Sequence, residues 1–210
     1  MLFHTSNKVT DAGRAQGVAE VLENAKPDSD FYILVVGAIL LAASGILLDS
    51  IPVLIASMVV APLMWPILGL SLGINSGDTK LIGRSLSMLV ISMIVALGVS
   101  ALGAHIALQY FGWNLQGIFI SFSPNYFFDV FIAVISGAIA AYGLVRTKVG
   151  GAMTGIGIAV SLMPPLVATG IGLVTSKILS ESALMIFALN VLGILIASCI
   201  TFAILKVKSK

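Results

Sequence analysis

The chain has 210 residues, of which 59% are hydrophobic and 10% are charged, and its mean hydropathy is +1.11. Soluble domains carry about 25% charged residues, so this composition excludes that class and indicates an all-α integral membrane protein. The net charge of +2 is too small to indicate a nucleic-acid partner, and a lone cysteine excludes an internal disulfide or a thiolate metal cluster.

Residues 1–30 are polar and contain five acidic groups, so we expect a cytoplasmic extension rather than a signal peptide. Asp11–Ala25 would form either a short helix on the membrane surface or a disordered segment, because Gly13 and Gly17 weaken a helix. From Phe31 onward, uncharged runs long enough to cross a bilayer follow one another. The lipid bilayer is therefore the first partner that the sequence predicts.

The first half, residues 31–108, contains three such runs. The first span is predicted over 31–48, between two aspartates, and the third over 85–108. The second run, residues 50–77, would form a straight helix of about 42 Å, whereas a hydrocarbon core is about 30 Å thick. Because Pro62 and Pro66 lie within this run, we expect a broken helix there.

The second half, residues 126–205, repeats this pattern after an interfacial connector rich in aromatic residues over 109–125. Spans are predicted over 126–145 and 182–205. Between them, the run 149–176 carries Pro164 and Pro165, so we expect a second broken helix. The basic tail 206–210 ends the chain. Six spans with both termini in the cytoplasm place ten of the eleven Lys and Arg residues on one side, which predicts an inner or plasma membrane protein.

The two halves also align residue by residue. Ile55-Ala56 matches Ile158-Ala159, Pro62-Leu63 matches Pro165-Leu166, and Gly69-Leu70 matches Gly172-Leu173. A unit of three spans ends on the opposite side of the membrane from where it began, so the second copy must insert upside down. The predicted fold is therefore six transmembrane helices in two inverted three-helix repeats, with proline-broken second and fifth spans.

A helix broken within lipid leaves backbone groups that need a partner or a wet cavity. We therefore predict a solute or ion path between the second and fifth spans. The alternative is that the prolines only kink the helices and the glycines only pack them. Asn190 would either bind another span or line the path, and Asp49 would either form a turn and cap a helix or attract ions at a pore mouth. The candidate path residues are Ser57, Pro62, Pro66, Gly69, Ser161, Pro164, Pro165, Gly172 and Asn190.

No carboxylate, lysine or arginine falls in the middle of a predicted span, which argues against a carboxylate proton relay. The sequence contains no metalloprotease, nucleotide-binding or metal-ligand motif, so we expect no enzyme activity, no cofactor and no metal. The interpretation is a transporter or channel-like protein for a small solute or ion, and the alternative is a membrane scaffold or assembly factor. Six thin, glycine-rich spans favour a homo-oligomer.

Three motifs together resemble a known family. They are GILLDS-x-PVLIASMVVAPLMWPILGLSLG, GD-x-x-LIGRSL and GIGIAVSLMPPLVATGIGL, and the resemblance covers about residues 31–205. The chain is similar to the bacterial and archaeal hydrophobic-domain family called domain of unknown function 389. That resemblance implies a multi-pass membrane protein whose substrate and activity are unassigned, and it assigns no role to any residue.

Overall fold

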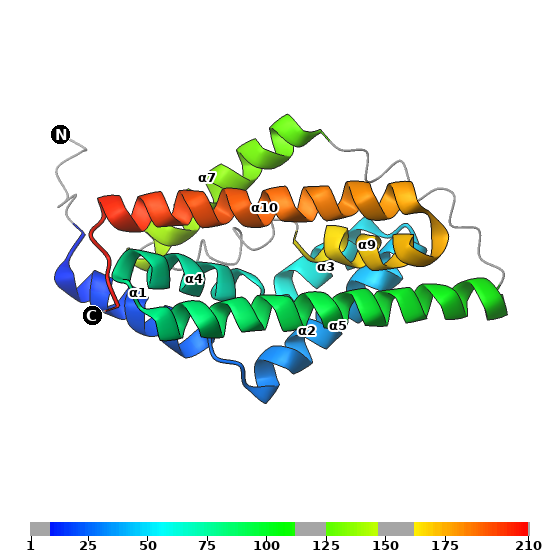
Figure 1. Ribbon diagram of the computed structural model, residues 1–210, viewed down its shortest axis with the longest axis horizontal. Helices are drawn as coiled ribbons and strands as arrows, with labels where there is room; N and C mark the ends of the chain where they lie inside the picture. The colour runs from blue at the N-terminus through cyan, green and yellow to red at the C-terminus, as the bar shows by residue number, and fades with distance from the viewer. Residues whose placement is uncertain (1–8, 112–124, 147–161, 210) are drawn as a thin grey trace.

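The regular structure of the protein is helical wherever it is described. The computed structural model describes residues 9–111, 125–146 and 162–209 (Figure 1). The helices in these ranges are α1 (Asp11–Asn24), α2 (Ser29–Leu47), α3 (Ile51–Val60), α4 (Met64–Ser76), α5 (Thr79–Phe111), α7 (Tyr126–Leu144), α9 (Met163–Thr175) and α10 (Lys177–Ile204).

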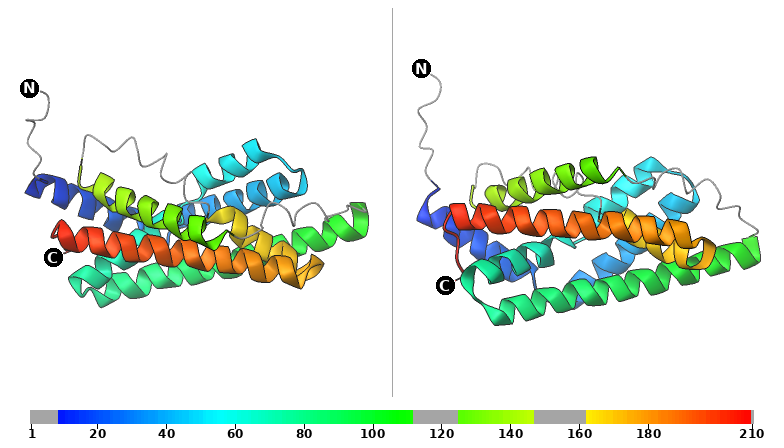
Figure 2. Two further views of the ribbon diagram at one scale, coloured as in Figure 1. Left: turned by 90° about the horizontal axis from the view of Figure 1, so that it is seen from above. Right: turned by 45° about the horizontal axis from the view of Figure 1, so that its top comes forward.

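Two long antiparallel helices, α5 and α10, run along the length of the molecule (Figures 1 and 2). With 33 and 28 residues, they would measure about 50 Å and 42 Å, longer than a hydrocarbon core of about 30 Å. The shorter helices α4 and α9 each pack against both long helices. Both start near the middle of the molecule and run toward opposite ends, and we call them the half-helices (Figure 1).

Within the described residues, α2, α5, α7 and α10 are each long and apolar enough to cross a membrane. The pair α3 and α4, bent by 42°, makes a fifth candidate span if it is counted as one. These helices confirm a multi-helix membrane protein. The count of six spans stays a prediction, because the segment 147–161 that precedes α9 lies outside the described residues, as does most of the predicted connector 109–125.

Small residues hold the helices close together, as expected where lipid competes for apolar side chains. The helices α7 and α10 meet through two glycines, one on each helix. A Cβ atom added to Gly137 would lie 2.6 Å from the carbonyl oxygen of Ile194, and one added to Gly193 would lie 2.7 Å from the Cβ of Ala133. The two backbones therefore approach to a distance that any side chain at these positions would prevent.

A tight turn joins α2 to α3. Asp49 adopts a positive φ of 50°, a left-handed conformation that aspartate tolerates better than most residues. The turn brings Gly45 against Leu54, whose backbone nitrogen would be 2.9 Å from an added Cβ. Asp49 is exposed, and Ser50 rather than Asp49 is the N-cap of α3. The structure therefore shows the turn role of Asp49, while a role in attracting ions stays a prediction.

The N-terminal segment forms a helix that packs on the protein. The side chain of Thr10 caps α1, and Val21 is buried in a small core with residues of α4 and α7. Gly13 and Gly17, which weaken a helix in isolation, lie against the carbonyl oxygens of Val145 and Leu144, within 2.6 Å of an added Cβ. Tertiary packing therefore selects the helix over the disordered alternative, and glycine is what permits the close approach.

Candidate functional site

The predicted break in the second apolar run lies between α3 and α4. The helix α3 ends at Val60, and α4 begins at Met64 after the connecting residues 61–63. Pro62 falls inside this connection and cannot donate a helical hydrogen bond. Its carbonyl oxygen accepts one from the backbone nitrogen of Trp65 at 3.2 Å. Pro66 lies in the first turn of α4, where a missing N–H costs little. Pro62 therefore coincides with the break, and Pro66 starts the next helix.

Ser57, the candidate path residue before this break, is completely buried. Its hydroxyl donates a 2.6 Å hydrogen bond to the carbonyl oxygen of Leu54, one turn earlier in α3. Its hydrogen is thus used within its own helix, although the oxygen keeps acceptor capacity. Ser161, its predicted counterpart, lies outside the described residues.

The proline pair Pro164 and Pro165 lies in the first turn of α9. Leu162 is the N-cap, and its carbonyl oxygen accepts a hydrogen bond from the nitrogen of Leu166 at 3.4 Å. The first amides of a helix have no acceptor within it, and the two prolines remove two of these donors. All ten residues from Met163 to Gly172 are buried. The prolines therefore suit the start of a helix that begins inside the protein.

Contacts with α5 give the depth at which the half-helices begin. A Cβ added to Gly69 of α4 would lie 2.5 Å from the hydroxyl oxygen of Ser85. A Cβ added to Gly170 of α9 would collide with the hydroxyl of Ser100, and it would lie 2.9 Å from the carbonyl oxygen of Leu97. These contacts fix α4 and α9 against two serines on one buried face of α5.

Counting residues from these contacts places the starts of both half-helices beside the middle of α5. The helix α4 runs antiparallel to α5, and Gly69 is five residues after its first residue. The helix α9 runs parallel to α5, and Gly170 is seven residues after its first residue. All helices rise by about 1.5 Å per residue, so the half-helices start level with roughly residues 90 to 93 of α5. Ser92 lies at this level. It is completely buried, and its hydroxyl has no hydrogen-bond partner among the described residues.

The same count along α10 gives a second polar residue at this level. A Cβ added to Gly172 of α9 would lie 2.5 Å from the backbone nitrogen of Ser180, and the hydroxyl of Ser71 in α4 lies 3.4 Å from the carbonyl oxygen of Leu195. Counting back along each half-helix puts both starts level with about residues 188 and 189 of α10. Asn190 lies there and is 7% exposed.

Together these helices build one core around the starts of the half-helices. It contains side chains from the beginning of α4, the beginning of α9 and the middle of the two long helices. They are Leu63, Ile67, Leu162, Met163, Leu166, Met88, Leu89, Ala96, Phe187 and Ile194. Ser92 and Asn190 are buried polar residues that lie at this level on the two long helices. The sequence analysis identified Asn190 and missed Ser92.

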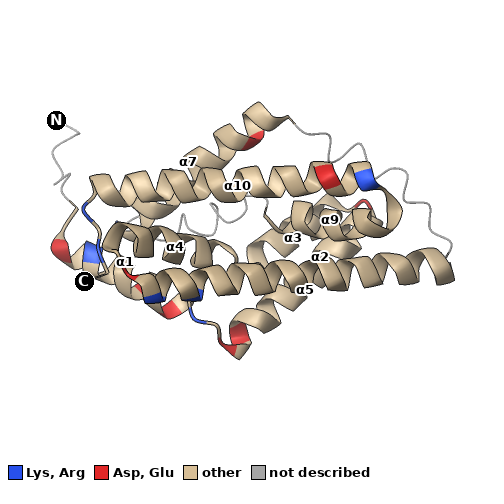
Figure 3. Ribbon diagram, viewed as in Figure 1, with Lys and Arg blue, Asp and Glu red and all other residues tan. Residues whose placement is uncertain are grey.

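Charged residues lie near both ends of the molecule and near the starts of α2 and α7, at its edges (Figure 3). No Asp, Glu, Lys or Arg occurs in α3, α4 or α9. Among the described residues, no group of three or more His, Cys, Asp and Glu side chains could hold a metal ion. Around the half-helix starts, helix dipoles, amides and hydroxyls are therefore the described groups that would attract a solute.

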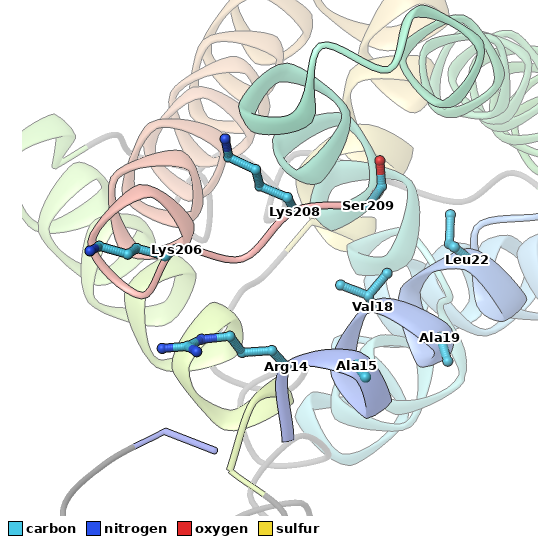
Figure 4. A pocket seen from close by; sticks show the side chains of 8 residues that line it. All are labelled: Arg14, Ala15, Val18, Ala19, Leu22, Lys206, Lys208 and Ser209. Atoms are coloured by element: carbon cyan, nitrogen blue, oxygen red, sulfur yellow. The ribbon is translucent and has the colours of Figure 1, made fainter. Parts of the chain in front are cut away.

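A hollow lies at the end of the molecule where α1 meets the C-terminal residues. It has a volume of about 510 Å³, an apolar wall from α1, and three cationic side chains, Arg14, Lys206 and Lys208 (Figure 4). The Nε of Arg14 donates a 2.9 Å hydrogen bond to the carbonyl oxygen of Leu205, which ties α1 to the end of α10. Arg14 of α1 and the basic C-terminal residues therefore lie together at one end of the protein.

Long apolar helices, and half-helices that contain no charged residue, define a multi-pass helical membrane protein. The chain belongs to the family described as Domain of unknown function (DUF389), which matches residues 58–196, more than half of its length. It is also 28% identical over 172 residues to the uncharacterized protein MJ0678 of Methanocaldococcus jannaschii. That match covers 81% of this chain and 52% of the relative, so the chain spans about half the length of the relative. No solved structure matches the chain.

Proposed function

We propose that this protein forms a transport path for a small solute or ion, and that the path passes between the starts of the half-helices α4 and α9. The observation that carries the proposal is their arrangement, since both begin in the middle of the molecule and run to opposite ends. Discontinuous helices that meet near the bilayer midplane are the recurrent plan of transporter binding sites.

Helix lengths support the inverted repeat on which the proposal rests. The helices α2 and α7 have 19 residues each, and α4 and α9 have 13 residues each. The half-helix bounds pair Met64 with Met163, which aligns Pro66 with Pro165 and Gly73 with Gly172. This register differs by four residues from the one that pairs Pro62 with Pro165, and it explains why both prolines lie in a first helical turn. Six spans in two inverted repeats follow if residues 147–161 complete the fifth span.

The distribution of basic residues supports an orientation. Arg14, Lys206 and Lys208 line one end of the molecule, whereas Lys177 lies at the opposite end with Glu181 (Figure 3). The side with the excess of Lys and Arg faces the cytoplasm. We therefore place both termini in the cytoplasm and the protein in the cell membrane. Exposed apolar residues along α5 and α7 offer faces for lipid or for a second copy, and we propose a homo-oligomer.

Purified protein in liposomes tests the transport proposal directly. The path requires a flux of at least one small solute above that of empty liposomes, and a solute that stabilises the detergent-solubilised protein against heat. The double variant Ser57→Leu with Ser161→Leu is expected to reduce this flux, because it places bulky apolar side chains before both half-helices. A membrane scaffold would bind none of the ions and metabolites screened. Absence of both flux and ligand-dependent stabilisation would favour the scaffold.

A further inference from the structure

We infer that the solute is a small inorganic or organic anion, and that Ser92 and Asn190 bind it between the starts of the half-helices. This inference rests on the proposed transport function and adds to it the charge of the solute and a binding residue, Ser92, on the helix α5. The argument has three steps, which concern the unused hydroxyl, the helix dipoles and the symmetry of the two polar residues.

The first step is the state of the Ser92 hydroxyl. Its side chain is completely buried, and its oxygen has no hydrogen-bond partner among the described residues. Serine in a membrane helix ordinarily bonds to the carbonyl oxygen of the preceding turn. Ser100, two turns further along α5 and also buried, does so with Ala96 at 2.5 Å. Ser92 is therefore a polar group whose hydrogen bond is available at the centre of the core, and buried hydroxyls without a partner are unfavourable unless a ligand supplies one.

The position of Ser92 on α5 directs it at the half-helices. The buried residues of α5 form one stripe that includes Ser85, Met88, Ser92, Ala96 and Ser100. Ser85 and Ser100 contact the two half-helices directly, and Met88 and Ala96 belong to the core formed by the first turns of α4 and α9. Ser92 lies between these neighbours on the same stripe. Its hydroxyl thus faces the level at which both half-helices begin.

The second step is the sign of the local field. The N-terminal end of an α-helix carries the equivalent of about half a positive charge, and its first amides point outward as donors. Two such ends meet at this level. The prolines remove part of the donor set, which leaves the amides of Leu63 and Met64 in α4 and of Leu162 and Met163 in α9 at the helix starts. No described carboxylate lies in the half-helices to favour a cation. The C-terminal end of α3, which lies at the same break, carries a partial negative charge, but two described N-terminal ends outweigh this one C-terminal end and favour an anion.

The third step is the repeat relation between the two polar residues. The N-caps Asp78 and Ser176 precede α5 and α10, and each side chain accepts a hydrogen bond from the nitrogen of the third residue after it. This common geometry aligns α5 with α10 at an offset that pairs Ser92 with Asn190 and Ser100 with Ser198. The hydroxyls of Ser100 and Ser198 each donate a hydrogen bond to the carbonyl oxygen four residues earlier in their own helix. Ser92 and Asn190 are therefore equivalent positions of two repeats, placed on opposite sides of one central site.

The test measures anion flux with the full-length protein in liposomes at constant ionic strength. Chloride, nitrate, formate and inorganic phosphate are compared as sodium salts, with gluconate as a bulky reference, and sodium and potassium fluxes are recorded separately. At least one small anion is expected to pass. Ser92→Ala should raise the half-saturating anion concentration by about tenfold to a hundredfold, because one hydrogen bond to a charged group is lost.

Ser100→Ala is the matched control, since it removes a buried hydroxyl from the same face of α5 that is already bonded within the helix. It should leave the half-saturating concentration unchanged. Ser92→Asp should abolish anion flux because a carboxylate would repel the anion, and heat stability of each variant in detergent checks that it folds. Anion flux that is insensitive to both Ser92 substitutions in folded protein overturns the inference. Flux of cations or neutral solutes without anion flux overturns the inference but keeps the transport function, and absence of any flux overturns both.

Discussion

Gly172 offers the sharpest test of how the half-helix α9 is held, and we predict that Gly172→Ala destabilises the protein. The added Cβ would lie 2.5 Å from the backbone nitrogen of Ser180, 2.7 Å from its Cα and 2.9 Å from its Cβ. Two of these three atoms belong to the backbone of α10, so no side-chain rotation relieves the clash. The ordinary range of van der Waals contacts begins at 3.4 Å, and α9 must therefore move away from α10 by nearly an ångström.

The expected cost follows from overpacking, which destabilises proteins by about 1–3 kcal/mol. Gly98→Ala is the matched control, because nothing lies within 4 Å of its added Cβ on the exposed side of α5. That variant should gain up to about 1 kcal/mol from helix propensity alone. The two alanine variants should thus differ by about 1–4 kcal/mol, or roughly 2–16 °C in melting temperature.

Thermal unfolding of the detergent-purified variants, followed by circular dichroism and by the loss of the monodisperse peak, measures this difference. Gly73→Ala extends the test to α4, where an added Cβ would lie 2.8 Å from the Cγ1 of Ile82 and no closer than 3.1 Å to a backbone atom. It should cost less than Gly172→Ala. If Gly172→Ala melts at or above the temperature of Gly98→Ala, the close packing of α9 on α10 described here is wrong.

Two further substitutions probe the contacts that join distant parts of the chain. Arg14→Ala removes the hydrogen bond to the carbonyl oxygen of Leu205, so it should lower the free energy of unfolding by about 1–2 kcal/mol and make α1 accessible to proteases. The control Asp11→Ala removes only an exposed ion pair and should change the free energy of unfolding by less than about 0.5 kcal/mol. Asn75→Ala removes the 3.1 Å bond from the Asn75 amide to the carbonyl oxygen of Cys199 and should cost about 1 kcal/mol, and a melting temperature equal to wild type would contradict this bond between α4 and α10.

The sequence predicted the helical class and the positions of most helices, because uncharged runs and their charged ends are local properties. It underestimated the length of the long helices. The span predicted over 85–108 is part of a helix that starts at Thr79, and the span predicted over 182–205 is part of one that starts at Lys177. The helices continue through Lys80, Arg84 and Glu181, because charged residues are tolerated once a helix leaves the hydrocarbon region.

Two features of the site depend on tertiary contacts and could not be predicted from local pattern. Ser92 is one of many serines in apolar segments, and only the packing of both half-helices against α5 distinguishes it from Ser100. The register of the repeat is the other. Proline identity aligned Pro62 with Pro165, whereas the helix bounds favour Pro66, because the physical requirement is a missing N–H in the first turn of a buried helix.

In the proposed inverted repeat, the central site pairs two unlike polar residues, Ser92 and Asn190. A serine hydroxyl donates one hydrogen bond, whereas an asparagine amide donates two and also accepts. Ser92 and Asn190 therefore differ in side-chain length and in the number of hydrogen bonds that they can make. A proposed inverted repeat with these two residues at its centre would have a symmetric backbone and unequal hydrogen-bonding groups on its two sides. Exchanging the two residues, with Ser92→Asn combined with Asn190→Ser, preserves the donor set while reversing its direction. If the site binds an anion from both sides, the exchanged protein should retain flux but reverse any preference for inward or outward movement, whereas a purely structural Asn190 would lose stability in the exchange without any directional change.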